Sequence, residues 1–305
     1  MSSYWTQRWF RAMGSDAHLI VGDAEPQLGD WAVAEVERLE QCWSRFRPDS
    51  ELSELNARVG ERVAVSRPMI RALATAEALW RLTDGAFDPT ILDALEWAGY
   101  DRSFELVDRH QPAPRRSARP AGGFERVELD LGAATVRLDP SVRLDLGGLG
   151  KGLAADLVAQ GLVDRGARSA LVSLGGDMRA AGEPPEDGWQ IPVEDPFDEE
   201  RVLVEHRLHD GAIVTSTRTF RRWRQGGEQR HHIIDPATGR PAATDVHAVV
   251  AAGPSAALAE ALAKTVIIVG ADRGRELLAR SGVTATVFGT DGSIVADGTA
   301  PVPAL

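Results

Sequence analysis

Apolar residues recur with two different periods along this chain of 305 residues. A spacing of three or four residues, typical of an amphipathic helix, marks residues 29–45, 68–83, 153–165 and 255–269. Alternation, or a short apolar run, predicts strands at 18–22, 124–131, 135–138, 142–146, 170–174, 189–193, 203–208, 212–216, 246–252, 284–288 and 293–296. Because strands outnumber helices and many are joined by short turns, we expect an α+β fold with mixed, largely antiparallel sheets and flanking helices.

Local signals refine this pattern. Ser50 is a candidate N-cap for a helix that begins after Pro48. The helix predicted at 68–83 ends at Asp84-Gly85. Residues 108–123 have no apolar period, which indicates a mobile surface loop; its four arginines are either solvated or a partner contact. No repeat or linker divides the chain, so we expect one domain over residues 1–305.

Composition narrows the class of protein. The net charge of −11 argues against a nucleic-acid surface, although a few donors can still hold a phosphate. The first ten residues lack the apolar stretch of a signal peptide, and no window approaches a membrane span, so we expect a cytoplasmic protein without a membrane partner. Cys42, the only cysteine, is expected in the core without a redox role.

The first candidate motif is the glycine-rich turn between Asp145 and Gly152, which contains Lys151. Glycines at the end of a strand allow backbone N–H groups to approach a ligand, and the following helix N-terminus favours an anion. The spacing matches neither a Walker A loop nor a dinucleotide fingerprint. The alternative is a tight turn with an exposed lysine.

The second candidate motif is His231-His232 followed by the turn Asp235–Gly239. Adjacent residues of a strand face opposite sides, so at most one histidine enters a given site. Such a histidine is a candidate general base, because its pKa lies near the working pH. A hairpin with one surface histidine is the alternative, and the spacing gives little support for a metal pair.

Three further segments carry polar residues next to turns or strand ends. They are Thr83–Thr90, Ser173–Asp177 with Gly175 and Gly176, and the hydroxyl-rich run around Ser216 that leads to Arg218. Taken alone, the first is more simply a buried turn with satisfied carboxylates, whereas Arg218 could hold a phosphate or ribose.

Taken in order, these blocks resemble the flavin transferase (ApbE) family, together with Met13-Gly14-Ser15 and the run from Trp43 to Asn56. The resemblance implies an ApbE-like, T-fold-like architecture. It also implies an enzyme that transfers the FMN moiety of FAD through a phosphoester bond to a threonine or serine hydroxyl of an acceptor protein, releasing AMP. Hydrolysis of FAD to FMN and AMP, or FAD binding without transfer, remain alternatives.

The resemblance also implies residue roles. Met13 and Phe46 would pack on the flavin, and His232 would be the base. The remaining residues of the FAD site would be Ala86, Phe87, Asp88, Asp145, Lys151, Gly175, Gly176, Asp177, Ser216, Arg218 and Ile233.

One position departs from the family pattern, which has a metal-binding Asp and Thr four residues apart. This chain has Glu260 and Lys264 there. Either Glu260, the Gly148 carbonyl and the diphosphate hold Mg²⁺, or the Lys264 ammonium takes the place of the metal. A third alternative is a plain surface ion pair with the metal site elsewhere.

Overall fold

The computed structural model describes residues 4–296. Residues 1–3 and 297–305 lie outside the described residues. They include both ends of the domain predicted over residues 1–305 and the first three of the ten residues that were searched for a signal peptide. The principal core contains residues from Ala12 to Val287, among them Leu19 and Val172. This shared core supports the single domain, which stays a prediction.

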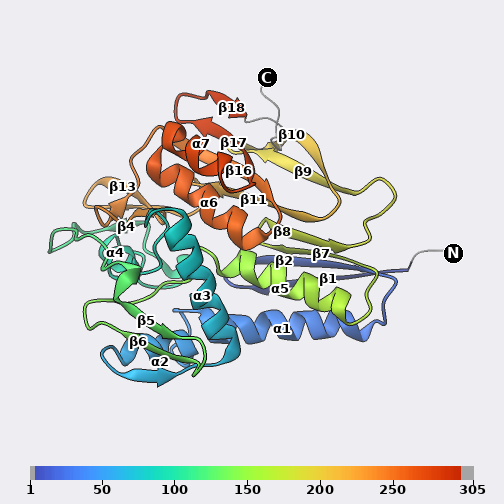
Figure 1. The fold of residues 1–305 in the computed structure, drawn as a ribbon. Coiled ribbons are helices and arrows are strands. Elements are labelled where there is room, and N and C mark those ends of the chain that lie inside the picture. The colour runs from blue at the N-terminus through green and yellow to red at the C-terminus, as the bar shows by residue number, and fades with distance from the viewer. Residues whose placement is uncertain (1–3, 297–305) are drawn as a thin grey trace.

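A sheet of antiparallel strands forms the centre of the molecule (Figure 1), in the order β1-β2-β7-β8-β11-β16-β17-β18. Its strands are β1 (Trp5–Ala12), β2 (Ser15–Gly22), β7 (Ser169–Leu174), β8 (Asp177–Gly182), β11 (Gly211–Thr217), β16 (Val246–Gly253), β17 (Thr284–Gly289) and β18 (Ile294–Ala296). Together with the helices described below, this sheet confirms the predicted α+β class.

Side chains alternate between the two faces of the sheet along each strand, and each face packs against different elements. Val172 and Val249 belong to the core beneath the helices α1 (Gln27–Trp43), α5 (Gly150–Asp164) and α6 (Ala256–Val269), with α7 (Ala271–Ala279) beside α6. Their neighbours Leu171 and Val250 pack with the hairpin of β9 (Trp189–Asp195) and β10 (Asp198–Leu208).

A group of smaller elements lies beside the helices, at the left and bottom of Figure 1. It contains the helices α2 (Glu51–Ala57), α3 (Arg67–Leu82) and α4 (Leu92–Trp97), the 3-10 turns Phe104–Leu106 and Phe124–Arg126, and the strands β3 (Arg62–Ala64), β4 (His110–Gln111), β5 (Val127–Asp130), β6 (Thr135–Leu138), β12 (Arg222–Gln225), β13 (Glu228–His231), β14 (Ile234–Asp235) and β15 (Arg240–Pro241). Trp223 and Tyr100 belong to a third apolar cluster in this region.

Most predicted elements are confirmed within a few residues. Ser50 caps α2 as expected, since its hydroxyl accepts the Ser53 N–H at 3.0 Å. Cys42 is buried, and burial together with Glu51 raises the pKa of its thiol to about 12, which agrees with a core residue. Within residues 4–296, none of the helices combines the length and the apolar character needed to cross a membrane.

The strand predicted at 142–146 is wrong. Its alternating apolar and polar residues mimic a strand. In the structure, the Leu144 backbone bonds to the Asn56 side chain in both directions, and the Asp145 N–H donates to the Pro89 carbonyl. The segment is therefore extended without a strand partner. Similarly, residues 124–126 form a 3-10 turn before β5.

Several elements were missed. The edge strand β1 exposes Trp9 and places Gln7, Arg8 and Arg11 among its aromatic residues, so it has little apolar periodicity. The strands β8, β12 and β13 and the short helices α4 and α7 were missed as well. The predicted loop at 108–123 contains β4, which pairs with β12, and its Ala121 N–H donates to the Pro236 carbonyl at 2.8 Å.

Candidate active site

Three adjoining cavities meet at Gly147 and Arg221, which line all of them. Their volumes are about 280, 70 and 530 Å³. Lys151 lines the first and third cavities, whereas His232 and Lys264 line the second and third. The cavities therefore form one groove, in which the glycine-rich turn and the histidine pair meet.

Most of the residues predicted to bind FAD lie along this groove. Met13, Phe46, Asp145 and Lys151 line the first cavity; Ala86, Phe87, Asp88, Ile233 and Gly148 line the second; Gly175, Gly176 and Ser216 line the third. Asp177, Arg218 and Glu260 do not line these three cavities. Asp177 and Glu260 lie beneath the groove as partners of Lys151, and the Arg218 guanidinium donates to the carbonyl and hydroxyl of Thr244.

The glycine-rich turn leads into α5, which begins at Gly150, three residues earlier than predicted. A Cβ at Gly152 would lie 2.5 Å from the Ala256 carbonyl oxygen, so only glycine allows α5 to approach α6 this closely. The Gly152 N–H donates to Glu260 Oε2 at 2.8 Å. The first turn of α5 is thereby attached to a carboxylate of α6.

Two lysines and two carboxylates form a cluster beneath the groove. Lys264 Nζ lies 2.7 Å from Glu260 Oε1, Lys151 Nζ lies 3.9 Å from the same atom, and Lys151 also pairs with Asp177. Burial opposes ionisation of Glu260, but the charges of Lys264 and Lys151 outweigh it and lower the pKa of Glu260. Burial also disfavours the Lys151 ammonium, yet the charges of Asp177 and Glu260 raise its pKa. Both side chains are therefore ionised, and the prediction of a plain surface pair at Glu260 and Lys264 is wrong, because Glu260 is fully buried.

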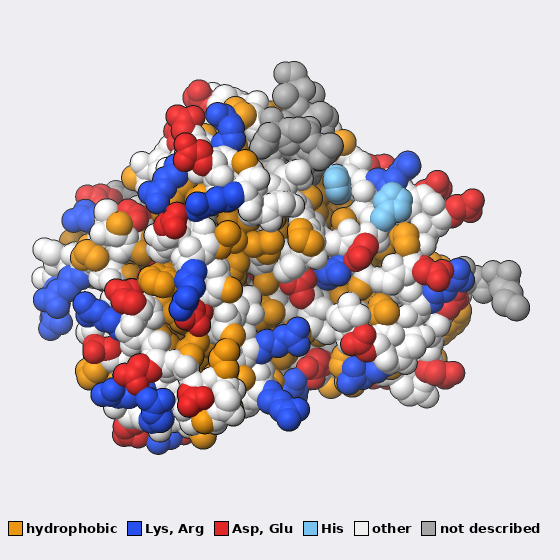
Figure 2. Space-filling view, in the orientation of Figure 1, with side chains coloured by type: hydrophobic (Ala, Val, Ile, Leu, Met, Phe, Trp, Pro, Cys, Tyr) orange, Lys and Arg blue, Asp and Glu red, His pale blue; other side chains and the backbone are white. Residues whose placement is uncertain are grey.

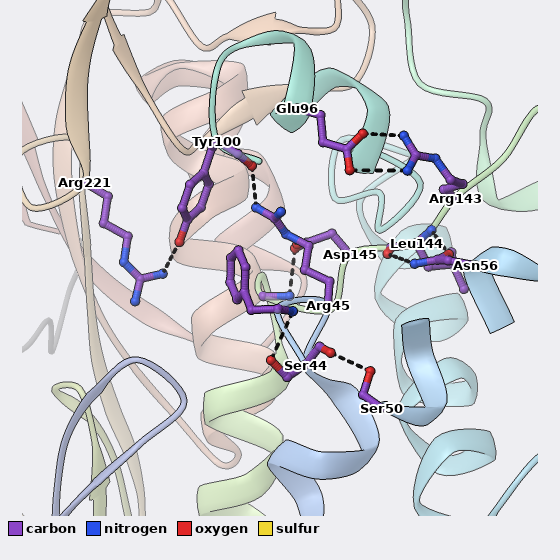
Figure 3. A network of polar contacts seen from close by, with 12 residues as sticks. Ser44, Arg45, Ser50, Asn56, Glu96, Tyr100, Arg143, Leu144, Asp145 and Arg221 are labelled. Carbon is purple, nitrogen blue, oxygen red and sulfur yellow. Dashed lines mark hydrogen bonds and ion pairs between the residues drawn. The ribbon is translucent and has the colours of Figure 1, made fainter. Parts of the chain in front are cut away.

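Arg45 fixes the other end of the glycine-rich turn (Figure 3). Its Nε lies 2.5 Å from Asp145 Oδ2, and its Nη2 donates to the Tyr100 carbonyl at 2.8 Å. The second oxygen of Asp145 accepts the Gly147 N–H at 2.8 Å. The Asp145 carboxylate, which was predicted to belong to the FAD site, therefore has a partner on each oxygen and shapes the turn.

The Thr83–Thr90 segment packs against this turn. Asp88 Oδ1 accepts the N–H and the hydroxyl of Thr90, at 2.8 and 2.6 Å, and burial raises the pKa of Asp88. The Phe87 ring lies so near Gly148 that a Cβ there would be 3.0 Å from its Cε2 atom. The expected buried, satisfied carboxylate is thus found at Asp88, whereas Asp84 is exposed and pairs with Arg280. The segment also forms a wall of the second cavity.

The two adjacent histidines have different surroundings. His231 bonds through Nε2 to the Ala242 carbonyl at 3.1 Å and accepts the Ile233 N–H on Nδ1 at 3.3 Å, and burial is the main reason that its pKa falls to about 4. His232 faces the groove, and its Nδ1 is buried without a hydrogen-bond partner among residues 4–296. Burial, followed by the charges of Arg221 and Lys264, lowers the pKa of His232 well below 6.5. His232 is therefore neutral at pH 7 and can accept a proton.

Sequence reasoning missed Arg45, Tyr100 and Arg221. Arg45 lies inside the run from Trp43 to Asn56, but no local sequence pattern indicates that it pairs with Asp145, 100 residues further along the chain. Arg221 follows Arg218 by three residues, and its Nη1 donates to the Tyr100 hydroxyl at 3.3 Å. The arginine that lines the groove is thus Arg221, whereas the sequence pattern favoured Arg218.

Comparisons with known proteins agree with this geometry. The model of the ApbE family matches residues 13–288. The FAD:protein FMN transferase of Treponema pallidum (strain Nichols) is 32% identical over 80% of this chain and 71% of its own length. The enzyme of the same name from Rhodobacter capsulatus is 31% identical over 90% of this chain and 52% of its own length, so the chain spans about half of that relative.

A solved structure has the same fold. The crystal structure of the ApbE protein from Thermotoga maritima aligns with a TM-score of 0.87 and 26% identity, covering 97% of this chain and 98% of that one. The family model alone covers most of the chain. Its match includes every residue that lines the three cavities except Trp9 and Arg11, which line the third. The chain therefore belongs to the ApbE family.

Proposed function

We propose that this protein transfers the FMN portion of FAD to a threonine or serine hydroxyl of an acceptor protein and releases AMP. The observation that carries the proposal is a neutral His232 that lines the same groove as Lys151, Lys264 and Arg221. A base beside several fixed cations suits attack of a hydroxyl on a diphosphate, because a hydroxyl is a poor nucleophile and the phosphates repel it.

The groove offers separate surroundings for the parts of FAD. The first cavity combines the apolar and aromatic side chains of Met13, Phe46 and Tyr100, which suit a flat ring system. Lys151 and Arg221 line both the first and the third cavities, so an anionic diphosphate has cations where these cavities meet.

The reaction then follows in one displacement. His232 takes the proton of the acceptor hydroxyl while its oxygen forms a bond to the FMN phosphorus. The bond from that phosphorus to the bridging oxygen breaks, and AMP leaves with the bonding electrons. The cations of the groove stabilise the charge that develops on the leaving phosphate.

Mg²⁺ is the cation that the family resemblance predicts, at Gly148, Glu260 and Lys264. The donor set does not fit it: Mg²⁺ requires oxygen ligands in an octahedron at about 2.0–2.1 Å, whereas residue 264 supplies an ammonium that already bonds to Glu260. Among residues 4–296, no three His, Cys, Asp or Glu side chains cluster in a way that could hold a metal ion. We therefore derive no step through Mg²⁺.

The third cavity is the route that we assign to the acceptor protein. It is the largest of the three, and its rim carries Trp9 and Phe220, which are 71% and 52% exposed. Exposed aromatic side chains next to a groove are typical of protein-binding surfaces.

Acidic and basic side chains are interspersed on the face drawn in Figure 2, and with the net charge of −11 this supports the prediction of no nucleic-acid partner. A membrane partner is likewise not expected. A cytoplasmic location remains a prediction, which fractionation of the producing cells tests.

The test is incubation of the pure protein with FAD and a candidate acceptor, such as a reductase subunit that carries covalent FMN in its mature form. A rise in acceptor mass by one FMN, with release of AMP, supports transfer. AMP without modified acceptor identifies FAD hydrolysis, and unchanged FAD leaves only an FAD-binding protein. His232→Asn should retain FAD binding but lose transfer by roughly 100-fold or more.

A further inference from the structure

Lysine is used at only two positions in this chain, Lys151 and Lys264, whereas 32 residues are arginine. Every other side-chain cation that forms an ion pair in residues 4–296 is therefore an arginine. Both lysines reach the same oxygen of one carboxylate, Glu260 Oε1. In a chain that otherwise supplies its positive charge as arginine, this placement indicates that the groove requires the compact, freely rotating ammonium group.

Each oxygen of Glu260 already accepts a hydrogen bond. Oε1 accepts from Lys264 at 2.7 Å, and Oε2 accepts from the Gly152 N–H at 2.8 Å. The side chain of Glu260 is fully buried, so the two contacts hold it in one orientation. Oδ2 of the Asp177 carboxylate pairs with Lys151.

The Lys264 ammonium lies at the boundary between this buried layer and the groove. Its side chain is 13% exposed and lines the second and third cavities together with Gly147 and His232. A metal ion at the same place would meet the ammonium charge at short range, which costs energy in a partly buried site. One ammonium N–H points to Glu260, and the group has further donors for an oxygen in the groove.

We propose that Lys264 is the cation that binds the FAD diphosphate in this protein, and that it does so in place of a divalent metal. The inference rests on the proposed function, because it concerns the same site. Lys264 stays protonated throughout and forms only hydrogen bonds: the acceptor proton goes to His232, and AMP leaves with the electrons of the broken P–O bond. Its charge stabilises the departing phosphate as a bound metal ion would.

The activity test compares transfer and FAD affinity in EDTA and in Mg²⁺. In the wild-type protein, we expect both to change by less than about two-fold between the two conditions. Lys264→Met keeps the length of the side chain without its charge, and we expect it to lose transfer by roughly 100-fold in both conditions. Lys264→Thr supplies a hydroxyl oxygen, so we expect it to be equally impaired in EDTA and restored at least about 10-fold by Mg²⁺.

The matched control is Arg275→Met on α7, which removes an exposed cation whose nearest acidic partner, Asp272, is 3.8 Å away. This variant should behave as the wild type in both conditions. A wild-type protein that loses FAD binding and transfer in EDTA overturns the inference, and so does a Lys264→Met variant that keeps both.

A second measurement is independent of activity. Because the chain has only two lysines, labelling the lysine side-chain nitrogens with ¹⁵N gives two ammonium signals at most, assigned with Lys264→Met. With FAD bound, added Mn²⁺ should leave the Lys264 signal unbroadened; broadening shows a metal beside it and overturns the inference.

The two proposals fail in different ways. If no acceptor is modified but FAD affinity is independent of EDTA and falls in Lys264→Met, the transfer proposal fails while the role of Lys264 stands. If transfer occurs only with a divalent metal, the transfer proposal stands and the role of Lys264 fails. If FAD does not bind in either condition, both fail.

Discussion

Arg45 and Asp145 form a buried ion pair in which Nε and Oδ2 are 2.5 Å apart and the two side chains are 5% and 10% exposed. The pair joins the end of α1 to the turn that precedes α5. It thereby fixes the border between the first and second cavities, which Asp145 lines on both sides.

Removing one partner of this pair should destabilise the fold. Arg45→Met leaves the Asp145 carboxylate buried without its cation, and we expect unfolding free energy to fall by about 3–5 kcal/mol. The double variant Arg45→Met with Asp145→Asn should lose less than the single one, because the charge is gone while Oδ1 can still accept the Gly147 N–H. Urea unfolding measures both.

The control for this pair is Arg58→Met, which breaks exposed pairs with Glu54 and Glu61. It should change the unfolding free energy by less than about 1 kcal/mol. Equal losses for Arg45→Met and Arg58→Met would show that burial of the Arg45 pair has no energetic consequence.

Gly152 should not accept any side chain. In Gly152→Ala the new Cβ would meet the Ala256 carbonyl at 2.5 Å, which forces α5 and α6 apart, and we expect a loss of about 1–3 kcal/mol. Gly150→Ala is the matched change in the same helix, where a Cβ meets nothing within 4 Å. Thermal unfolding should show Gly150→Ala unchanged or slightly stabilised. Comparable melting temperatures for the two variants would contradict the proposed close contact.

The acid side of the pH profile should report His232. Its pKa is lowered well below 6.5 by burial and by nearby cations, so the neutral form needed to accept a proton persists as pH falls below 6.5. We expect kcat/KM for FAD transfer to hold its value on that acidic side and to decline only as pH reaches the lowered pKa. A decline centred near the pKa of an ordinary histidine would contradict this environment. With FAD bound, the negative diphosphate should raise the pKa and move the decline in kcat to higher pH.

Stability should also depend on pH through His231. Its folded pKa of about 4 lies below that of an unfolded histidine, about 6.5, so between these values the unfolded chain binds more protons. The contribution of His231 to the unfolding free energy is therefore complete above the pKa of the unfolded chain. It is lost as pH falls, by up to about 1.4 kcal/mol per pH unit and about 3 kcal/mol in all.

The corresponding variant is His231→Asn, tested by urea unfolding at a series of pH values. Between pH 4 and 6.5, the slope of the unfolding free energy against pH should fall by an amount equivalent to about one proton. His209→Asn, in the exposed turn before β11, is the control and should leave the slope unchanged. A slope that is the same in both variants would assign the acid sensitivity to other groups.

Elements with strong local signals, and the family, were predictable from the sequence alone. The long helices and the Ser50 cap follow from apolar periodicity and from one hydroxyl before a helix. The ordered motifs around Lys151 and His232 were sufficient to predict the family, because such motifs consist of neighbours in sequence.

Which residues share the site becomes visible only in the folded chain. Arg45 meets Asp145 across 100 residues, and Lys264 meets Glu260 in a buried layer that Lys151 enters from another helix. The edge strand β1 and the extended segment at 142–146 were misjudged for a related reason. Burial and hydrogen-bond partners come from distant segments, so a local pattern of apolar residues cannot distinguish a strand from a segment held by the Asn56 side chain. The departure at Lys264 is visible in the sequence, but its meaning as a fixed cation depends on the buried carboxylate and the groove that surround it.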